Sequence, residues 1–352
     1  FHPAPWKLES PERRARAAWR VAECSVTGDT PAQRTLRALV PRLVDLLGTG
    51  DDLLDLCLAA AIGRLGDPGA AEAMRELSQR GRSPATQRYA HQAWLMLQTP
   101  EALQAHADKL AGEWQDTLDL AAHGGDLTDR LGETLDTNRR TWAHLLPAWY
   151  AIALARPDVR ARLLDVLRGL PLEPGTFQGV RYVYKAAELR RDAEVVGVLH
   201  ARFENTGPGA RPTSQRRKRI RAYGPRTRDY LRLRGWRHLR RLAAIAHPAA
   251  PDLAVHLLLG LADDDQPEAR DEHRWASVDG RYQRTLRHHP AGAGWLIVPK
   301  LLLPEMPGLQ ASARGKRWWT QGPLDVTHAF PERTDGLRAM WDRHPDALLR
   351  LA

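Results

Sequence analysis

Apolar residues recur along the chain three or four positions apart, and alternation at every second position is nearly absent. This spacing is typical of amphipathic helices. Ala, Leu and Arg dominate these segments, and all three favour helix. Prolines that follow mostly short polar residues mark helix starts, because such residues cap free amides and proline is tolerated in the first turn. The pairs are Ser10-Pro11, Thr30-Pro31, Asp67-Pro68, Ser83-Pro84, Thr99-Pro100 and Arg156-Pro157. The pattern predicts an all-α chain of three- to four-turn helices.

The clearest helix pair runs from Leu39 to Gly66. Its first helix contains Pro41 within an apolar stripe, and proline removes a helical hydrogen bond and bends the helix. A Gly-Thr-Gly corner and the acidic pair Asp51-Asp52 lead into the second helix. Three alanines, Ala59 to Ala61, would allow that helix to pack closely against its neighbours, and Gly66 is placed to end it.

This unit resembles the HEAT repeat, in which a proline-kinked helix is followed by an acidic corner and a second helix. Weaker echoes follow, and the resemblance covers roughly residues 30–205, with residues 111–136 departing most from it. These echoes lie at 68–97, at Leu145–Trp149 with Asp158–Arg160, and at 180–193. The resemblance implies an α-solenoid of stacked antiparallel helix pairs. It also implies a scaffold that holds proteins or nucleic acids on its concave side.

The pattern changes after residue 205. Loop-forming Gly and Pro residues lead into a run of charge, and a long helix is predicted from near Arg226 to about Ala246. Further helices are expected at 251–262 and 335–350. Between them, we expect an irregular insertion partly ordered by tryptophans. These are Trp275, Trp295, Trp318 and Trp319. The predicted divisions are 1–205, the repeat array; 206–262, the basic loop and further helices; 263–334, the insertion; and 335–352, the terminal helix.

Positive charge is concentrated in one segment. The chain has a formal net charge of +10, and residues 211–241 contain 13 of its 52 basic and one of its 42 acidic side chains. The remainder, with 39 basic and 41 acidic side chains, is slightly acidic. Because a localised basic patch steers a polyanion to one surface, the segment is the leading candidate for a binding site.

Within this segment, one stripe of the predicted helix is suited to polyanion binding. Tyr230, Arg234, Arg237 and Arg241 are spaced four, three and four residues apart, opposite an apolar side with Leu231, Trp236, Leu239 and Leu242. Arginines in a row can bind successive phosphates, and tyrosine can stack on a base. The candidate nucleic-acid-binding residues are Arg216, Arg217, Lys218, Arg219, Arg226, Tyr230, Arg234, Arg237 and Arg241.

Three other interpretations of the basic segment remain open. It can meet an acidic protein partner, so that the chain is a protein-interaction scaffold. It can also be a solvated face, or one paired with acids of neighbouring repeats. Finally, some HEAT-like proteins excise alkylated bases from DNA, but no catalytic position of that group aligns with this sequence. We therefore expect a binding protein more than an enzyme, with nucleic acid or an acidic protein as its partner.

Motifs for other chemistry are absent from the sequence. There is no Gly-x-Ser-x-Gly, no phosphate-binding Gly-x-x-x-x-Gly-Lys and no His-Glu-x-x-His. Asp263–Asp265 reads better as a loop than as a cation site, and the adjacent His288 and His289 would point apart on a regular element. We assign no catalytic residue, no metal ligand and no cofactor.

Composition favours the cytoplasm and no membrane partner. No apolar run reaches the roughly 18 residues that span a bilayer. The two cysteines, Cys24 and Cys57, lie in helical contexts and are expected to be free thiols in a reducing compartment. Residue 1 is Phe and the last residues read as the middle of a helix, so we expect an excerpt of a longer protein.

Overall fold

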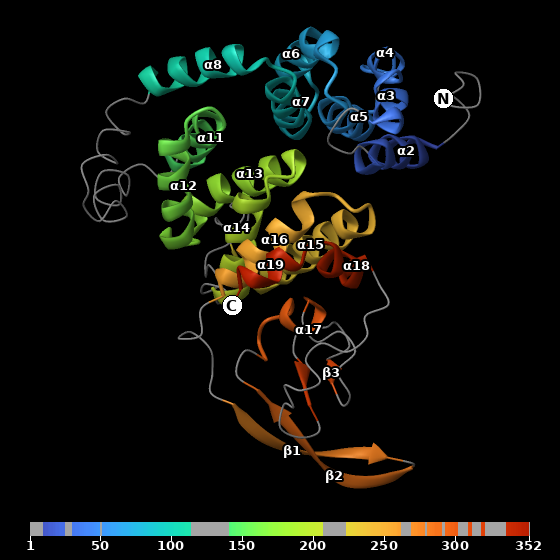
Figure 1. The fold of residues 1–352 in the computed structure, drawn as a ribbon, viewed down its shortest axis with the longest axis vertical. Coiled ribbons are helices and arrows are strands. Elements are labelled where there is room, and N and C mark those ends of the chain that lie inside the picture. Colours follow the sequence, from blue (N-terminus) through green and yellow to red (C-terminus); the bar gives the residue numbers. More distant parts are fainter. Residues whose placement is uncertain are drawn as a thin grey trace, which may run out of the picture. The chain divides into compact units, whose positions relative to one another are not determined.

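A computed structural model of the chain is mostly helical (Figure 1). It describes residues 10–24, 30–49, 51–113, 141–206, 223–261, 269–278, 280–290, 293–301, 309–311, 318–320 and 336–351. The chain divides into two compact units: residues 1–170 with 178–192, and residues 171–177 with 193–352. The main boundary between the units, at residues 192 and 193, thus lies before the predicted end of the repeat array at residue 205.

Helices form the described part of the first unit. They are α2 (Pro11–Cys24), α3 (Pro31–Arg37), α4 (Val40–Val44), α5 (Asp52–Leu65), the 3-10 turn η1 (Pro68–Ala70), α6 (Ala71–Arg80), α7 (Pro84–Met96), α8 (Pro100–Glu113), α11 (Thr141–Ala153), α12 (Pro157–Gly169) and most of α13 (Pro174–Arg190). Helix α5 is the core of the N-terminal half, with almost all of Leu54–Leu65 buried between α2 and α7.

Local chemistry sets the limits of α5 as the sequence predicted. The Asp51 carboxylate accepts hydrogen bonds from the Leu53 and Leu54 amides and caps the start of the helix. Gly66 ends it in the left-handed conformation, with φ of 70°. Gly63 allows close packing on α7, because a Cβ there would lie 2.8 Å from the Ala93 Cβ. Pro41 does not bend a continuous helix; it lies in the first turn of α4, after a break that separates α4 from α3.

Two arginines join helix ends in the first unit. Arg64 donates to the backbone carbonyls of Ala22, Glu188 and Leu189, at 3.2, 3.0 and 2.8 Å. Arg191 donates to Ala22 and Glu23, both at 3.0 Å. The last carbonyls of a helix have no helical partner, and cations stabilise them. These contacts fasten the C-terminal ends of α2, α5 and α13 together.

The second unit also has a helical core. Its helices are α14 (Ala193–Asn205), α15 (Pro225–Ala244), α16 (Ala249–Leu259), the short α17 (Val298–Leu301), α18 (Gly336–Arg343) and α19 (Pro345–Leu349). The predicted helix from Arg226 to Ala246 is confirmed as α15, and the helix at 251–262 is α16. Glycines permit close contacts here: a Cβ on Gly197 would lie 2.6 Å from the His256 Cβ, and one on Gly235 would lie 2.2 Å from His200 Nδ1.

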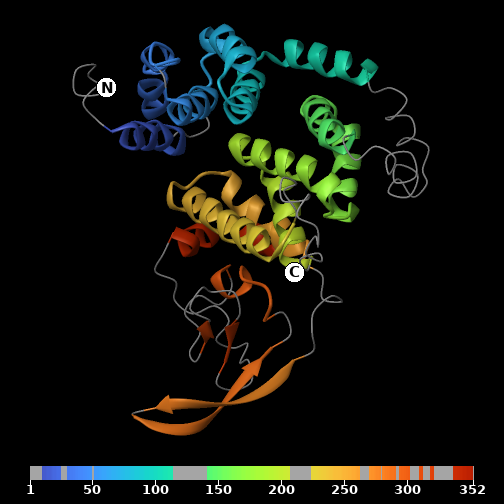
Figure 2. The ribbon, with the colours of Figure 1, turned by 180° about the vertical axis from the view of Figure 1, so that it is seen from behind.

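One expectation about residues 263–334 is wrong: the segment contains a β-hairpin. Strands β1 (Arg270–Val278) and β2 (Arg281–His289) pair antiparallel over their whole length, with Trp275 opposite Arg284 (Figure 2). The short strands β3 (Gln310–Ala311) and β4 (Trp318–Trp319) pair beside it. Most β2 residues are exposed or half-buried on both faces, so no apolar alternation marks the hairpin in the sequence.

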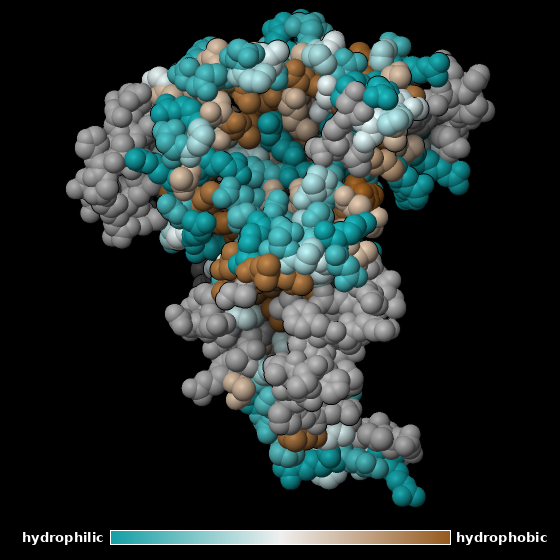
Figure 3. Space-filling model, viewed as in Figure 1, coloured by the Kyte–Doolittle hydropathy of each residue, from teal (hydrophilic) through white to brown (hydrophobic). Residues whose placement is uncertain are grey.

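Hydrophilic residues cover most of the described helical surface visible in Figure 3, with apolar residues showing in patches between them. Among the described helices, none is both long enough and apolar enough to span a membrane.

Candidate nucleic-acid interface

Helix α15 places the predicted basic residues in space. It begins with Pro225 in its first turn, where a proline ring is tolerated, and runs for 20 residues. Leu231, Leu239, Leu242 and Ala243 are buried on one side, as the apolar pattern predicted. Helical geometry then turns the residues around Arg237 away from the core.

The outward side of α15 collects the predicted residues that the structure describes. Arg226, Arg237 and Arg241 are exposed, Tyr230 is 46% exposed, and Arg234 is half-buried, while Arg240, which is outside the predicted set, is exposed on the same side. We call these six residues the α15 arginine face. The predicted loop residues Arg216, Arg217, Lys218 and Arg219 lie outside the described part of the chain.

Contacts within the α15 arginine face are mostly local. Arg234 donates to the Tyr230 hydroxyl at 2.7 Å and lies 6.0 Å from the centroid of its ring. Arg237 donates to the Leu233 carbonyl one turn earlier, at 3.2 Å. Among the residues that the structure describes, no carboxylate pairs with Arg226, Arg237 or Arg240. No described carboxylate therefore neutralises the charge of these three guanidinium groups.

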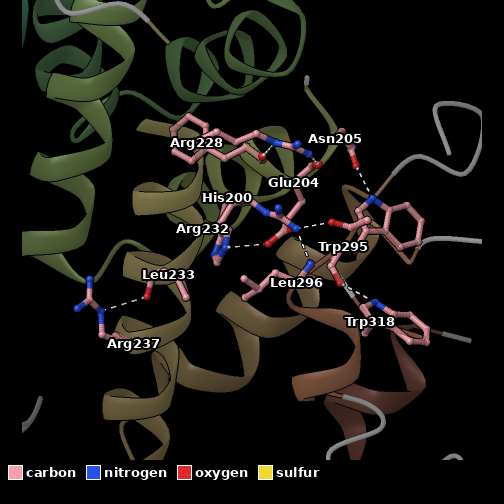
Figure 4. Close-up of polar contacts among 12 residues, drawn as sticks. His200, Glu204, Asn205, Arg228, Arg232, Leu233, Arg237, Trp295, Leu296 and Trp318 are labelled. Atoms are coloured by element: carbon pink, nitrogen blue, oxygen red, sulfur yellow. Dashed lines mark hydrogen bonds and ion pairs between the residues drawn. The ribbon is translucent and has the colours of Figure 1, made fainter. Parts of the chain in front are cut away.

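The inward side of α15 uses arginine differently. Arg232, only 2% exposed, donates through Nε to Glu204 Oε2 of α14 at 2.7 Å, and also donates to the Gly294 carbonyl (Figure 4). Arg237 points to the opposite side of the helix in the same view. A buried ion pair needs further hydrogen bonds to offset the loss of water, and here the backbone supplies part of them, since Arg232 also donates to a carbonyl while Glu204 Oε1 has no hydrogen-bond partner among the described residues.

Glu204 is the centre of this buried cluster. It is 1% exposed, and its Oε2 also accepts a hydrogen bond from the Leu296 amide at 2.9 Å. Nε2 of the fully buried His200, one turn earlier, lies 3.6 Å from Oε1. Burial acts to raise the pKa of Glu204, but His200 and Arg232 outweigh it, so the pKa is lowered. The carboxylate is therefore charged at neutral pH.

A second inward arginine closes the end of α14. Arg228 donates to the Phe203 carbonyl at 3.1 Å and to the Glu204 carbonyl, both in the last turn of that helix. Burial, followed by the nearby charge of Arg232, lowers the pKa of Arg228. The Tyr223 hydroxyl also donates to Phe203, at 3.2 Å. Helices α14 and α15 are thus joined by charge as well as by apolar contact.

The buried cluster and Asn205 also hold the segment that follows the hairpin in the chain. Trp295 donates through its indole to Asn205 Oδ1 at 3.1 Å, and the buried Trp318 donates to the Trp295 carbonyl at 3.0 Å (Figure 4). Two residues later, Thr320 and His288 exchange both backbone hydrogen bonds at 2.8 Å. Trp295 and Trp318 therefore order this region, as predicted, but Trp275 does not, because it is 71% exposed.

The first unit contains a hollow that the sequence did not suggest. Nine residues line it: Leu56, Ala85, Arg88, Tyr89, Gln92, Tyr182, Lys185, Ala186 and Leu189. Gln92 donates to the Tyr182 hydroxyl at 3.2 Å, while its buried Oε1 has no partner among the described residues. Burial raises the pKa of Tyr182. Two tyrosine rings, Tyr89 and Tyr182, thus line the hollow together with Gln92.

Two adjacent histidines of β2 pair with acids of β1. His288 Nδ1 lies 2.8 Å from Asp271 and His289 Nε2 lies 3.0 Å from Glu272, each between the paired strands. Within the described ranges, no group of three or more His, Cys, Asp or Glu residues is arranged to hold a metal ion. Asp263–Asp265 lies outside those ranges.

No family model matches the chain, and comparisons with curated proteins and solved structures found no match. The function must therefore be inferred from the residues themselves. The buried cluster was missed in the sequence, although His200 and Glu204, four residues apart in the mostly apolar helix α14, were a signal for it.

Proposed function

We propose that the chain is a non-enzymatic scaffold that binds nucleic acid through the α15 arginine face. The observation that supports this most is the difference between the two sides of one helix. Arg228 and Arg232 are engaged by carbonyls and a carboxylate, whereas Arg226, Arg237 and Arg240 are exposed and have no carboxylate partner in the described structure. Unneutralised guanidinium groups in a row are suited to phosphate contacts.

The length of the face also suits a polyanion. Arg226 and Arg241 are separated by about 22 Å of helix at 1.5 Å per residue. Duplex DNA has about one negative charge per 1.7 Å of its axis, so several phosphates fall within this length. Base-independent contacts of this kind bind nucleic acid without reading its sequence.

The proposal includes two further features. The scaffold is of the HEAT-like type, because α5, with its acidic start and left-handed Gly66, and α11, with Pro147 inside it, have the local chemistry of that repeat. The working compartment is the cytoplasm, in keeping with the free thiols of Cys24 and Cys57.

Charge reversal tests the proposal. We would measure the affinity of the full chain for fluorescent single-stranded and duplex DNA and RNA over a range of salt concentrations. The variant R226E/R237E/R240E should weaken binding at low salt by about tenfold or more. It should also reduce the slope of log affinity against log salt by about 3, one for each lost phosphate contact.

A matched control separates this face from net charge. R16E/R20E/R42E changes the charge by the same amount at three exposed arginines of the first unit, and should leave most of the affinity intact. If R226E/R237E/R240E keeps its affinity within twofold of the unmodified protein, or if the unmodified protein binds no nucleic acid at low salt, the proposal is wrong.

An acidic protein partner remains the alternative for the same face. The two proposals differ in a direct measurement. A stoichiometric partner that stays bound after nuclease treatment, and is lost in R226E/R237E/R240E, would replace nucleic acid as the ligand.

A further inference from the structure

The β1–β2 hairpin has two chemically different faces. In an antiparallel pair, directly opposed residues project to the same side, and successive pairs alternate. One face contains Asp271 with His288, His273 with Leu286, and Trp275 with Arg284, and Tyr282 of β2 lies on it too. The other contains Arg270 with His289, Glu272 with Arg287, and Arg274 with Thr285. We call the first the ribbon aromatic face.

Large side chains on the ribbon aromatic face are exposed. Tyr282 is 78% exposed, Trp275 71% and Leu286 38%. Trp275 has Arg284 directly opposite and Tyr282 and Leu286 at its two diagonal positions. Diagonal neighbours lie roughly 7–8 Å apart, about twice the spacing of stacked bases. An indole, a phenol and a guanidinium thus share one open surface.

The opposite face is partly occupied at its base. The Arg287 guanidinium lies 4.2 Å from the centroid of the Trp319 ring, and the His289 ring centroid lies 6.2 Å from it. Both Arg287 and His289 project to this opposite face. No described helix lies along the hairpin in either ribbon view (Figures 1 and 2). The aromatic face is therefore the open one.

Charge on the hairpin favours an anion. The two strands contain five arginines, Arg270, Arg274, Arg281, Arg284 and Arg287, against the acids Asp271 and Glu272. Both acids are already engaged: Asp271 with His288, and Glu272 with Arg274 at 2.7 Å and His289 at 3.0 Å. In the described structure, Arg284 on the aromatic face has no carboxylate partner.

We propose that the ribbon aromatic face binds single-stranded nucleic acid, with bases stacked on Trp275 and Tyr282 and a phosphate held by Arg284. This deepens the proposed function, on which it rests, by naming the form of its ligand. Exposed aromatic rings beside arginine are the means by which proteins hold unpaired bases.

The chemistry disfavours the other occupants of this face. A two-stranded ribbon can enter the major groove of duplex DNA, but there it contacts base edges through hydrogen bonds, and the faces of paired bases are hidden. A second copy of the chain would bring its own Arg284 to the contact, and like charges repel. An unpaired strand offers both base faces and phosphates.

Aromatic substitutions test the inference. In the full chain, W275A/Y282A should weaken binding to a fluorescent 20-nucleotide dT strand by about tenfold or more, since each stacked base contributes measurably. Affinity for a 20-base-pair duplex should change less than threefold. The salt slope should stay unchanged, because stacking releases no counterions, whereas R226E/R237E/R240E should reduce the slope.

Two controls and one physical measurement complete the test. W275F/Y282F should stay within about threefold of the unmodified protein, and L259A/L349A, which removes exposed apolar surface elsewhere, should have no effect. Circular dichroism and thermal unfolding should show that all variants fold alike.

Three results would overturn the inference while leaving the α15 proposal standing. The first is an unchanged affinity of W275A/Y282A for the dT strand. The second is an equal loss of affinity for the dT strand and for the duplex. The third is sedimentation that shows a dimer for the unmodified protein and a monomer for W275A/Y282A. An unchanged salt slope in R226E/R237E/R240E would instead reject the α15 proposal.

Discussion

Two sides of α15 use the same residue type in opposite ways. Arg232 is buried against Glu204 and the Gly294 carbonyl, whereas Arg237, five residues later, is exposed and, among the described residues, donates to Leu233 of its own helix. Removing the partner of a guanidinium group in water changes the free energy of folding little. Removing the partner of a buried guanidinium group costs much more, because an unpaired charge then stays buried. The inner arginines therefore support the fold, whereas the exposed Arg237 contributes little to it.

Removing Arg232 should have the largest effect on stability. The variant R232M leaves Glu204 as an unpaired buried charge, which typically costs about 3–5 kcal/mol. We expect the urea midpoint of the second unit to fall sharply, monitored by Trp fluorescence and circular dichroism.

A double variant identifies the cause. R232M/E204L replaces both charges by apolar groups and should recover a large part of the loss, since a buried pair adds little over apolar packing. R237M, which changes the same residue type on the outer side, should shift the midpoint little. A double variant as unstable as R232M would show that packing by the arginine stem, and not its charge, explains the effect.

Replacing Gly235 should have the next largest effect. An alanine Cβ there would lie 2.2 Å from His200 Nδ1, so α14 and α15 must separate. Overpacking of this kind costs about 1–3 kcal/mol, partly offset by the higher helix propensity of alanine. G235A should therefore lower the urea midpoint.

The exposed helical glycine Gly112 is the matched control. A Cβ there would meet no atom within 4 Å, so G112A should leave the midpoint unchanged or raise it slightly. Because the close contact is with His200, H200A/G235A should be more stable than G235A. If G235A is as stable as the unmodified protein, the close approach of the two helices is not as described.

Much of the helical structure could be predicted because its signals are local. Asp51, Gly66 and Pro225 act within one helical turn, and the apolar side of α15 follows from a repeat of 3.6 residues. The burial of Arg232 was not predicted, because it depends on Glu204, 28 residues earlier, and on the backbone near residue 294. Helical spacing does put Arg232 on the apolar side beside Leu239, and Arg234 on the opposite side, but it does not identify the buried partner of Arg232.

The β1–β2 hairpin, unlike the helices, could not be predicted from local signals. A half-buried strand has an alternating apolar pattern, but most residues of β1 and β2 are exposed on both faces, so hydrophobic spacing did not reveal them. Backbone pairing and the anchoring of Trp318 to Trp295 are long-range features. The exposed Trp275 and Tyr282 were consequently not recognised as a surface.

Acid should destabilise the second unit in a defined pH range, because it protonates Glu204 of the buried pair with Arg232. The folded pKa of Glu204 lies below its ordinary value of about 4.5, because His200 and Arg232 outweigh the effect of burial. Its stabilisation is therefore fully present above the unfolded pKa, near 4.5, and is lost as pH falls through the lower, folded value.

A comparison with the variant E204Q separates the pH effect of Glu204 from that of the other acidic residues. Glutamine has the shape of the carboxyl group without its charge. The difference in urea midpoint between the unmodified protein and E204Q should be largest above pH 5 and should shrink as pH falls below about 4.5. A difference that stays constant over this range would mean that the charge of Glu204 does not stabilise the fold.

Substitutions of the exposed arginines of α15 should have the smallest effect on stability. Exposed substitutions away from specific contacts usually change stability by less than about 0.5 kcal/mol. In R226E/R237E/R240E, the urea midpoint should therefore stay close to that of the unmodified protein, while nucleic-acid affinity falls. Such a separation of stability from binding would distinguish the two sides of α15 in one experiment. A large loss of stability would mean instead that these arginines support the fold, and the contrast with Arg232 would disappear.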